Sequence, residues 1–356
     1  MFATRRTGWI GIDIGTSTVK AAQVVRNGRQ LRLAAAAVVP RRKGWPIADL
    51  SDQPAISSAD QIRAALSLRA NFRGSRVAAT LPMALCDVHV LDRTFDTELH
   101  QDRIIRQAIE TATQRSADHL QFDAWTVEEP DNGRSGRTNI ITAPQTWTDQ
   151  LCEDIARAGG SCQAIDGLPL ALARAVGMIQ QGSHEAPAAA LDWGFGRATF
   201  CLIVDSRPVY VRCLKECGFQ RSLEAIAEHL QVTQDEAQRL LVEHGLPGPT
   251  DNESIDTAKV LEKLLAEPLN QLEEEVRRTI SHLKIQRRMP PPHAIYLLGG
   301  GAATRGIDSH LAARLRTPVH VWQLAHDAAL DTQHGALPIS LFGPAAALSA
   351  LAWEKS

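Results

Sequence analysis

Two segments of the chain have apolar runs on either side of a short stretch of small and hydroxylated residues. The first is IGIDIGTSTVKAAQVV at residues 10–25, and the second is AALDWGFGRATFCLIV at residues 189–204. Apolar runs separated by turn residues predict two β-hairpins. In both segments an aspartate ends the first run and a glycine follows two residues later. This recurrence predicts a duplicated architecture with two lobes that face each other.

Between the hairpins the spacing of apolar residues changes several times from helical to strand-like. Residues 57–72 begin with Ser58 and Gln61 at the spacing of a capping box and continue with a helical pattern. The order that follows is β-α-β-β-α-β, which predicts a compact α/β unit at residues 85–165. Its expected elements lie, in that order, at 86–95, 97–114, 122–130, 137–144, 146–160 and 161–166.

The second half of the chain continues the alternation of strands and helices. Helical patterns dominate residues 219–287, where we expect Pro268 to kink or divide a long amphipathic element. A strand, a glycine run at 299–301 and a helix follow, and an alanine-rich helix closes the chain. The fold class predicted from these patterns is α/β.

Length and composition narrow the possible classes of protein. A chain of 356 residues exceeds the size at which one hydrophobic core usually stops growing, so several subdomains are expected. No apolar run approaches the roughly 18 residues of a membrane span, and residues 1–11 lack the apolar stretch of a signal peptide. We therefore expect a cytoplasmic protein. Residues 1–80 carry 13 basic and 4 acidic side chains, which could favour an anionic surface or a scattered solvated one.

Several kinds of site have no support in the sequence. The six cysteines form no C-x-x-C pair, and we expect them to be free thiols. The 12 histidines show no H-E-x-x-H spacing, and no G-x-S-x-G motif is present. A zinc site or a hydrolase nucleophile is therefore not predicted, and no nucleic acid is expected as a partner.

The turns of the two hairpins have the chemistry of phosphate-binding loops. Glycine permits positive φ and carries no Cβ, so backbone N–H groups can point at an anion, and hydroxyl side chains add donors. Asp13 and Asp192 at the strand ends could hold a hydrated Mg²⁺. The predicted phosphate-binding residues are Gly15, Thr16, Ser17, Thr18, Lys20, Gly194, Gly196 and Thr199. The glycine run Gly299, Gly300 and Gly301 would let the backbone approach a nucleoside.

These three segments, DIGTST, DWGFG and GGGA, resemble the motifs of the actin-like ATPase superfamily. Within that superfamily the chain is most similar to the PilM family of type IV pilus assembly proteins. That family is itself similar to the cell-division protein FtsA and to the cytoplasmic domain of the type II secretion protein GspL. The segments AIDGLPLALARA and SLEAIAEHLQVTQDEAQRLL add to the likeness. The resemblance implies a two-lobed actin-like ATPase fold with an inserted α/β subdomain.

The resemblance also implies a ligand and a division into subdomains. The cofactors would be ATP and Mg²⁺, held between the lobes, with Lys284 and Arg287 as further nucleoside contacts. The expected subdomains are 1A (1–84, 166–187 and the closing helix 341–356), 1C (85–165), 2A (188–225 and 291–340) and 2B (226–290).

As a PilM-like protein the chain would be a cytoplasmic scaffold of a pilus or secretion apparatus. It would bind the cytoplasmic tail of a single-span inner-membrane partner of PilN type, with subdomain 1C contributing to the groove. Through that partner it would lie at the inner membrane, and pilus assembly ATPases and self-association are further possible contacts.

One departure from the family pattern bears on hydrolysis. Where actin-like hydrolases place a glutamate or glutamine that orients water, this chain has Leu168, with Asp166 as a nearby substitute. We therefore expect slow or absent ATP hydrolysis. Trp193 is expected to pack behind the second loop, and Arg197 to face either phosphate or solvent. The alternatives are a sugar or carboxylate kinase of the same superfamily and a pseudo-ATPase adaptor that binds no nucleotide.

Overall fold

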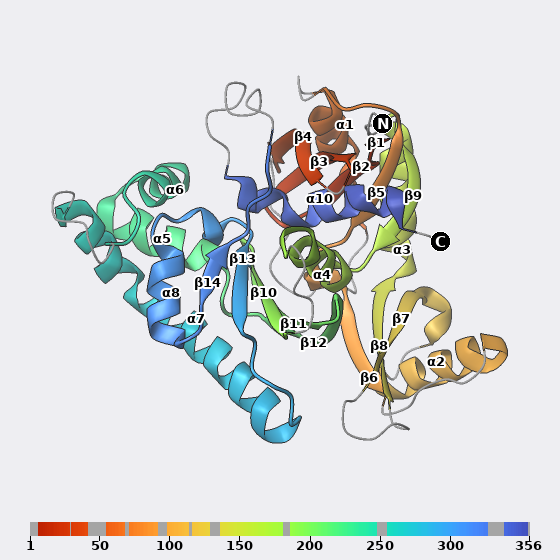
Figure 1. The fold of residues 1–356 in the computed structure, drawn as a ribbon. Helices are drawn as coiled ribbons and strands as arrows, with labels where there is room; N and C mark the ends of the chain where they lie inside the picture. Colours follow the sequence, from red (N-terminus) through yellow and green to blue (C-terminus); the bar gives the residue numbers. More distant parts are fainter. Residues whose placement is uncertain are drawn as a thin grey trace.

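The computed structural model describes ten stretches of the chain and places them in two large lobes with a smaller third unit (Figure 1). The stretches are 6–28, 30–41, 55–67, 71–91, 98–113, 116–128, 136–180, 186–247, 255–326 and 338–354. Within these stretches there are three β-sheets, and each belongs to one of the three parts.

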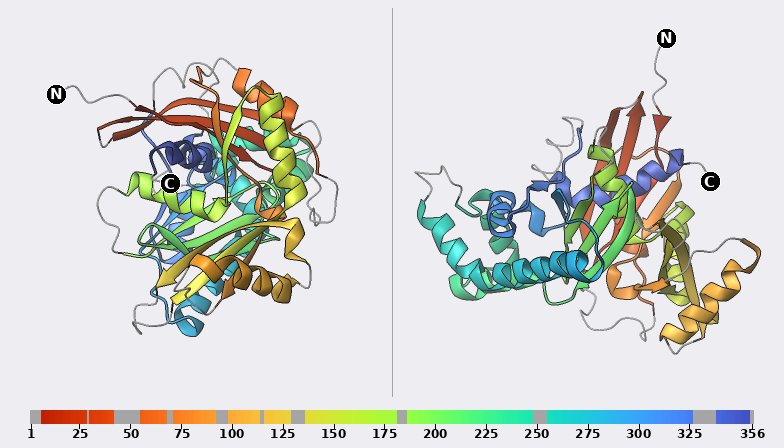
Figure 2. Two further views of the ribbon diagram at one scale, coloured as in Figure 1. Left: turned by 90° about the vertical axis from the view of Figure 1, so that its right-hand side faces the viewer. Right: turned by 60° about the horizontal axis from the view of Figure 1, so that its bottom comes forward.

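The first lobe is a six-stranded sheet covered on both faces by helices. Its main path is β1-β3-β2-β5-β9, and β4 pairs with β3. Helices α1 and α3 cover one face, while α10 and α4 lie on the other, between the two lobes (Figures 1 and 2). The strands are β1 (Arg6–Thr7), β2 (Ile10–Ile14), β3 (Thr18–Asn27), β4 (Gln30–Pro40), β5 (Arg76–Thr80) and β9 (Ser161–Asp166). The helices are α1 (Ala59–Ser67), α3 (Gln145–Arg157), α4 (Leu168–Ile179) and α10 (Gly343–Ala350).

The second lobe is a five-stranded sheet in the order β12-β11-β10-β13-β14. One face packs on α4, and the other packs on four helices around a core rich in leucine. The strands are β10 (Ala188–Trp193), β11 (Ala198–Val204), β12 (Arg207–Leu214), β13 (Ala294–Leu298) and β14 (Val319–Val321). The helices are α5 (Phe219–Leu230), α6 (Gln234–Glu243), α7 (Ile255–Gln286) and α8 (Ile307–Leu315). Short 3₁₀ turns occur at η1 (Met83–Leu85), η2 (Ala117–His119), η3 (Gly301–Ala303), η4 (Ile339–Phe342) and η5 (Leu351–Trp353).

The two lobes share one local topology, as the recurring sequence pattern predicts. In the first lobe the antiparallel hairpin β2–β3 is flanked by the parallel strand β5, and in the second β10–β11 is flanked by the parallel strand β13. The aspartate of each hairpin occupies an equivalent register position, opposite Lys20 in one lobe and Thr199 in the other.

The third unit is a three-stranded sheet in the order β6-β8-β7, with α2 packed on it. Its elements are β6 (Asp87–Leu91), α2 (Glu98–Thr113), β7 (Leu120–Glu128) and β8 (Gly136–Pro144). It lies below the first sheet in Figure 1, on the far side from α6 and the N-terminal part of α7, and Figure 2 shows the same separation.

The expectation that Ser161–Asp166 closes this third unit is wrong. This strand, β9, pairs in parallel with β5 of the first sheet, so that Asp166 lies opposite Thr80. The reason is the helix before it, because α3 buries Trp147, Leu151 and Ile155 in the core under the first sheet. Helix α3 and strand β9 therefore return the chain to the first lobe. The subdomain boundaries drawn from the sequence stay predictions.

Two further expectations concern long helices. Pro268 does not divide the long element predicted around it, because α7 runs as one helix of 32 residues. Leu265, Leu269 and Leu272 on both sides of the proline are buried in the core of the second lobe and hold the helix together. None of the helices in the described stretches combines the length and the apolar character needed to cross a membrane.

Candidate functional site

An ion pair lies at the end of the first hairpin. Asp13 on β2 and Lys20 on β3 are directly opposite in the antiparallel register, which puts their side chains on the same face of the sheet. Lys20 Nζ lies 2.7 Å from Asp13 Oδ2. Only 10% of the Asp13 side chain and 13% of the Lys20 side chain are exposed. The pair is thus held away from bulk water, where its charges interact strongly.

Asp192 from the second lobe completes a cluster of three charges. Burial raises the pKa of Asp192 to about 6, while the positive charge of Lys20 lowers it and the negative charge of Asp13 raises it. Burial also lowers the pKa of Lys20, but Asp13 and Asp192 together outweigh this effect, so that its pKa lies above the ordinary value. The two aspartates, one from each lobe, therefore lie close enough to act on each other, and both line one cleft, as the paired hairpins predict.

These charges line a cleft of about 320 Å³ between the lobes. Most of the residues predicted from the sequence to bind a nucleotide line the same cleft, although they come from three distant segments. They are Asp13, Gly15, Thr16, Ser17, Thr18, Lys20, Asp192, Gly194, Gly196, Thr199, Gly299 and Gly300. The structure thus brings both loops and the start of the glycine run together.

Three predicted nucleoside contacts are not brought to this cleft. Gly301 packs behind it, where a Cβ would lie 2.2 Å from the ring of Trp193. Lys284 is exposed and Arg287 is half-buried, and neither lines the cleft. Both belong to the C-terminal end of α7 and the residue after it, whereas the helices that reach the cleft are α4, α5 and α6.

The glycines act differently from the expectation of positive φ in both loops. Gly15, Gly194 and Gly196 are not among the glycines with positive φ. What Gly15 and Gly194 supply is space, because a Cβ on either would lie 3.0 Å from the carbonyl oxygen of Thr18 or Arg197 respectively. Positive φ occurs instead at Gly299, at 85°, where a Cβ would also lie 2.6 Å from Asp192 Oδ1.

The structure adds lining residues that the sequence motifs did not indicate. Phe219 and Leu223 from α5 and Gln238 from α6 line the cleft, and Phe219 lies next to Gly300. Helix α5 is tied to the second loop, since the N–H groups of Phe219 and Gln220 donate to the carbonyls of Gly194 and Phe195. The segment containing Leu223 and Gln238 is one that resembles PilM, which is the signal that could have identified them.

Trp193 and Arg197 now have definite surroundings. Trp193 is 2% exposed and meets Phe219 edge to face, with ring centroids 5.2 Å apart, which confirms that it packs behind the loop. Arg197 lines the cleft, and its Nη1 donates to Cys213 Sγ at 3.7 Å. Cys213 lines another cavity that Arg197 also lines, so the guanidinium does not point only into the cleft.

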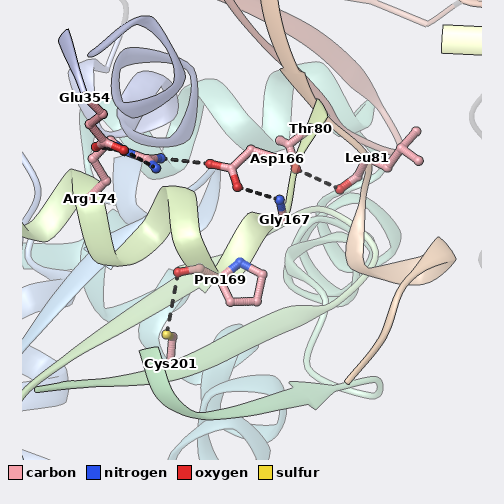
Figure 3. A network of polar contacts seen from close by, with 8 residues as sticks. All are labelled: Thr80, Leu81, Asp166, Gly167, Pro169, Arg174, Cys201 and Glu354. Carbon is pink, nitrogen blue, oxygen red and sulfur yellow. Dashed lines mark hydrogen bonds and ion pairs between the residues drawn. The ribbon is translucent and has the colours of Figure 1, made fainter. Parts of the chain in front are cut away.

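Asp166 cannot serve as the substitute for the missing water-orienting residue. Its carboxylate accepts hydrogen bonds from the Gly167 N–H and from Arg174 Nη1, at 2.9 and 2.8 Å (Figure 3). Burial raises the pKa of Asp166, while the charge of Arg174 lowers it. Arg174 also pairs with Glu354, which completes a network separate from the cleft. Leu168 does line the cleft.

The donor set fits a hydrated magnesium ion. Among the described residues that line the cleft, Asp13 and Asp192 are the only carboxylates. They repel each other, as the effect of Asp13 on the pKa of Asp192 shows, and a divalent cation would relieve this repulsion. Two carboxylates with room for water and phosphate oxygens are the usual environment of Mg²⁺. No cluster of three or more metal-binding side chains occurs in the stretches that the structure describes.

Comparisons with known proteins agree with this arrangement. The family model described as type IV pilus assembly protein PilM matches residues 11–340. The cell division protein FtsA of Streptococcus pneumoniae is 23% identical over 331 residues, which cover 83% of this chain and 71% of FtsA.

Among solved structures, the fold is similar to that of a PilM-PilN type IV pilus biogenesis complex. The TM-score is 0.78 at 20% identity, with 98% of this chain and 99% of that chain covered. The ethanolamine utilization protein EutJ from Carboxydothermus hydrogenoformans gives a TM-score of 0.55 at 12% identity, with 97% and 89% covered. The two-lobed actin-like ATPase fold predicted from the motifs is confirmed. Because the family model matches most of its length, the chain belongs to the PilM family of type IV pilus assembly proteins.

Proposed function

We propose that the chain binds ATP with Mg²⁺ in the cleft between the lobes and serves as a nucleotide-dependent scaffold of type IV pilus assembly. The observation that supports this most directly is that Asp13 and Lys20 from one lobe and Asp192 from the other line the same cleft and interact through their charges. A cation and a polyphosphate would together match these charges. The ion, when bound, would neutralise phosphate charge and the two carboxylates.

Each loop supplies groups suited to a phosphate. Ser17 and Thr18 offer hydroxyl donors from the first hairpin, and Thr199 offers one from the second. Lys20 supplies the positive charge. Phe219, Leu223 and Gln238 line the same cleft as Gly299 and Gly300, and their apolar contact and one polar side chain would suit a nucleobase.

We further propose that hydrolysis is slow or absent. A water attacking the terminal phosphate needs an oriented base or hydrogen-bond acceptor. Leu168 cannot supply one, and Asp166 lies outside the cleft and is held by Arg174. Asp13 and Asp192, the carboxylates among the described residues of the cleft, belong to the proposed metal site. The same lack of a further carboxylate among the described residues of the cleft argues against a sugar or carboxylate kinase, which would need a base for its acceptor hydroxyl.

The proposed partner is the cytoplasmic tail of an inner-membrane protein of PilN type. Family membership and the similarity to a PilM-PilN complex support it. A second cavity of about 310 Å³ lies between the third unit and the first lobe and is lined by β7, β8, α3 and the end of β9. We propose this cavity as part of the groove for the tail, which would bring the protein to the cytoplasmic face of the inner membrane.

Thermal unfolding with and without nucleotide tests the ligand. At 100 times its dissociation constant, Mg-ATP should stabilise the fold by about 2.7 kcal/mol, and chelation of Mg²⁺ should reduce the effect. An unchanged Tm would favour the pseudo-ATPase adaptor. Steady phosphate release at about 1 per second or faster, which is typical of enzymes, would contradict slow hydrolysis. Transfer to a small acceptor would favour the kinase.

The partner is tested separately. The N-terminal tail of a PilN-type protein encoded beside this chain should bind it in a pull-down. Replacing Phe122, which lines the second cavity, by alanine should weaken that binding, while Arg63→Ala, on an exposed face, should not.

A further inference from the structure

Arg41 is a buried cation directly behind the first phosphate loop. It follows β4 and is 9% exposed. Its Nε donates to the carbonyl oxygen of Gly15 at 2.9 Å, and its backbone N–H donates to the carbonyl oxygen of Ser17 at 2.8 Å. One residue therefore holds two carbonyl groups of a four-residue turn.

Because the peptide bond is planar, these two contacts also fix the directions of two backbone N–H groups. In a trans peptide the C=O of one residue and the N–H of the next point in opposite directions. Holding the Gly15 carbonyl fixes the direction of the Thr16 N–H, and holding the Ser17 carbonyl fixes that of the Thr18 N–H. Thr16 and Thr18 both line the cleft, whereas Arg41 is not among the residues that line it.

A buried network in turn holds the guanidinium. Arg41 Nη2 donates to Ser58 Oγ at 3.0 Å, and the N–H of Ser58 donates to Asp154 Oδ2. The hydroxyl of Ser57 donates to Asp154 Oδ1 at 2.7 Å, and Gln150 Nε2 donates to the same oxygen at 2.9 Å. Asp154 lies on α3 and is 1% exposed. The position of Arg41 is thereby linked to α3 through Ser58.

The charge of Arg41 reaches the cleft as well. Burial lowers the pKa of Arg41 to about 10, against the opposing effect of Asp154, so the guanidinium stays protonated at neutral pH. Its positive charge acts on Lys20, whose pKa it lowers. Arg41 therefore adds positive potential behind a loop that already carries the Lys20 charge.

From these contacts we propose that Arg41 is a positioning residue for phosphate binding. It aims the N–H groups of Thr16 and Thr18 into the cleft, and Ser58 and Asp154 hold it in place. This proposal rests on nucleotide binding in the cleft, as set out above. It does not require Arg41 to touch the ligand.

The first variant is Arg41→Lys, which keeps the charge but cannot bond Gly15 and Ser58 together through one planar group. We expect its affinity for Mg-ATP to fall about tenfold, which corresponds to about 1.4 kcal/mol. Its affinity for adenosine, which has no phosphate, should stay within twofold of the wild type. A general loss of structure would lower the affinities for both ligands. Comparing the two affinities therefore separates a positioning role of Arg41 from an effect on stability.

Amide hydrogen exchange provides a second test, which needs no nucleotide. In the free protein, Arg41→Lys should speed exchange in a peptide covering residues 14–18 and leave peptides of the second lobe unchanged. Arg63→Lys is the matched control, because Arg63 is exposed and its guanidinium donates to the carbonyl oxygen of Arg157 instead. This control should change neither the exchange nor the ATP affinity.

A milder variant covers the case in which Arg41→Lys does not fold. Ser58→Ala removes one acceptor of Arg41. The affinity for Mg-ATP should again fall, by roughly threefold, which is a typical effect of losing one hydrogen bond. If a folded Arg41→Lys or Ser58→Ala protein binds Mg-ATP as tightly as the wild type, with unchanged exchange at 14–18, the positioning role is refuted. If the wild type binds no nucleotide, the proposed function fails. The hydrogen-exchange experiment still decides whether Arg41 holds residues 15–18.

Discussion

Lys20 Nζ lies 2.7 Å from Asp13 Oδ2, and the two residues occupy directly opposite positions on β3 and β2. This pair is nearly buried, and Asp192 of the other lobe is close enough to act on the pKa of Lys20. One cation therefore balances two carboxylates in the free protein, and the balance changes when a ligand brings further charge.

Removal of the lysine charge should harm both stability and binding. Lys20→Met leaves Asp13 and Asp192 facing each other without a cation, and breaking a buried ion pair typically costs about 3 to 5 kcal/mol. Urea unfolding should show a loss of that order, and Mg-ATP should no longer raise Tm. Lys284→Met is the control on an exposed part of α7, and a similar loss there would contradict the assignment.

The raised pKa of Asp192 predicts an unusual pH dependence. In the folded protein this carboxyl has a pKa of about 6, against 3.8 as its ordinary value. Between these values the folded state binds more protons than the unfolded state, so the free energy of unfolding should fall as pH rises from 4 to 7. The contribution of this group is roughly 2 to 3 kcal/mol.

Asp192→Asn isolates that contribution, because the amide does not titrate. Urea unfolding of the free protein at several pH values should show the decline in the wild type and a smaller one in the variant. An identical slope in both proteins would assign the titration to another group.

Gly299 should be sensitive to substitution for two reasons at once. Its φ of 85° disfavours any side chain, and a Cβ would lie 2.6 Å from Asp192 Oδ1. Gly299→Ala should destabilise the protein by about 1 to 3 kcal/mol and lower its affinity for Mg-ATP. Gly74→Ala is a matched control, since Gly74 has a φ of 78° with nothing within 4 Å of a Cβ. Equal effects of the two variants on nucleotide affinity would contradict the crowding at Asp192.

The absent water-orienting group can be supplied. Leu168 lines the cleft, and Leu168→Glu would introduce a carboxylate there. We expect phosphate release from Mg-ATP to rise at least about tenfold over the wild type, which is less than the roughly 10²- to 10⁴-fold usual for general-base catalysis. Leu168→Met preserves the apolar wall and should leave the rate low. A fast wild type, or no gain in a Glu variant that still binds ATP, would refute this explanation.

Two of the cysteines should form a disulfide under oxidation. Cys152 Sγ on α3 and Cys162 Sγ on β9 lie 3.6 Å apart, and Cys152 is exposed. A diazene oxidant such as diamide would take two hydrogens from the thiols, which leaves the disulfide and a reduced hydrazine. Peptide mass spectrometry should find the 152–162 link, and Cys152→Ser should abolish it. A link that instead involves the buried Cys201 would show that the fold differs.

The local patterns of the chain predicted many elements because their physics is local. The hairpins at β2–β3 and β10–β11 follow from apolar runs around turn residues, and the loop motifs pointed to Asp13 and Asp192 before any contact was visible. Of the two effects expected of Pro268, a kink or a division, the division does not occur, because α7 is one helix. Burial of Leu265 and Leu269 stabilises that helix, and such burial depends on distant parts of the chain.

The placement of β9 is the clearest case that needed the tertiary structure. Spacing alone shows a strand at Ser161–Asp166, but only the packing of α3 decides that it joins β5 and not the three-stranded sheet. For the same reason, Gly301, Lys284 and Arg287 were assigned to a site that they do not line.

What the sequence by itself determined was the repeated hairpin, the chemistry of its turns and the family. Only the tertiary structure decided that Asp166 is held by Arg174, that Phe219 and Gln238 line the cleft, and that Arg41 holds the loop from behind. The physical reason is that a motif records which groups are available. Distances between groups far apart along the chain are set by how the sheets and helices pack.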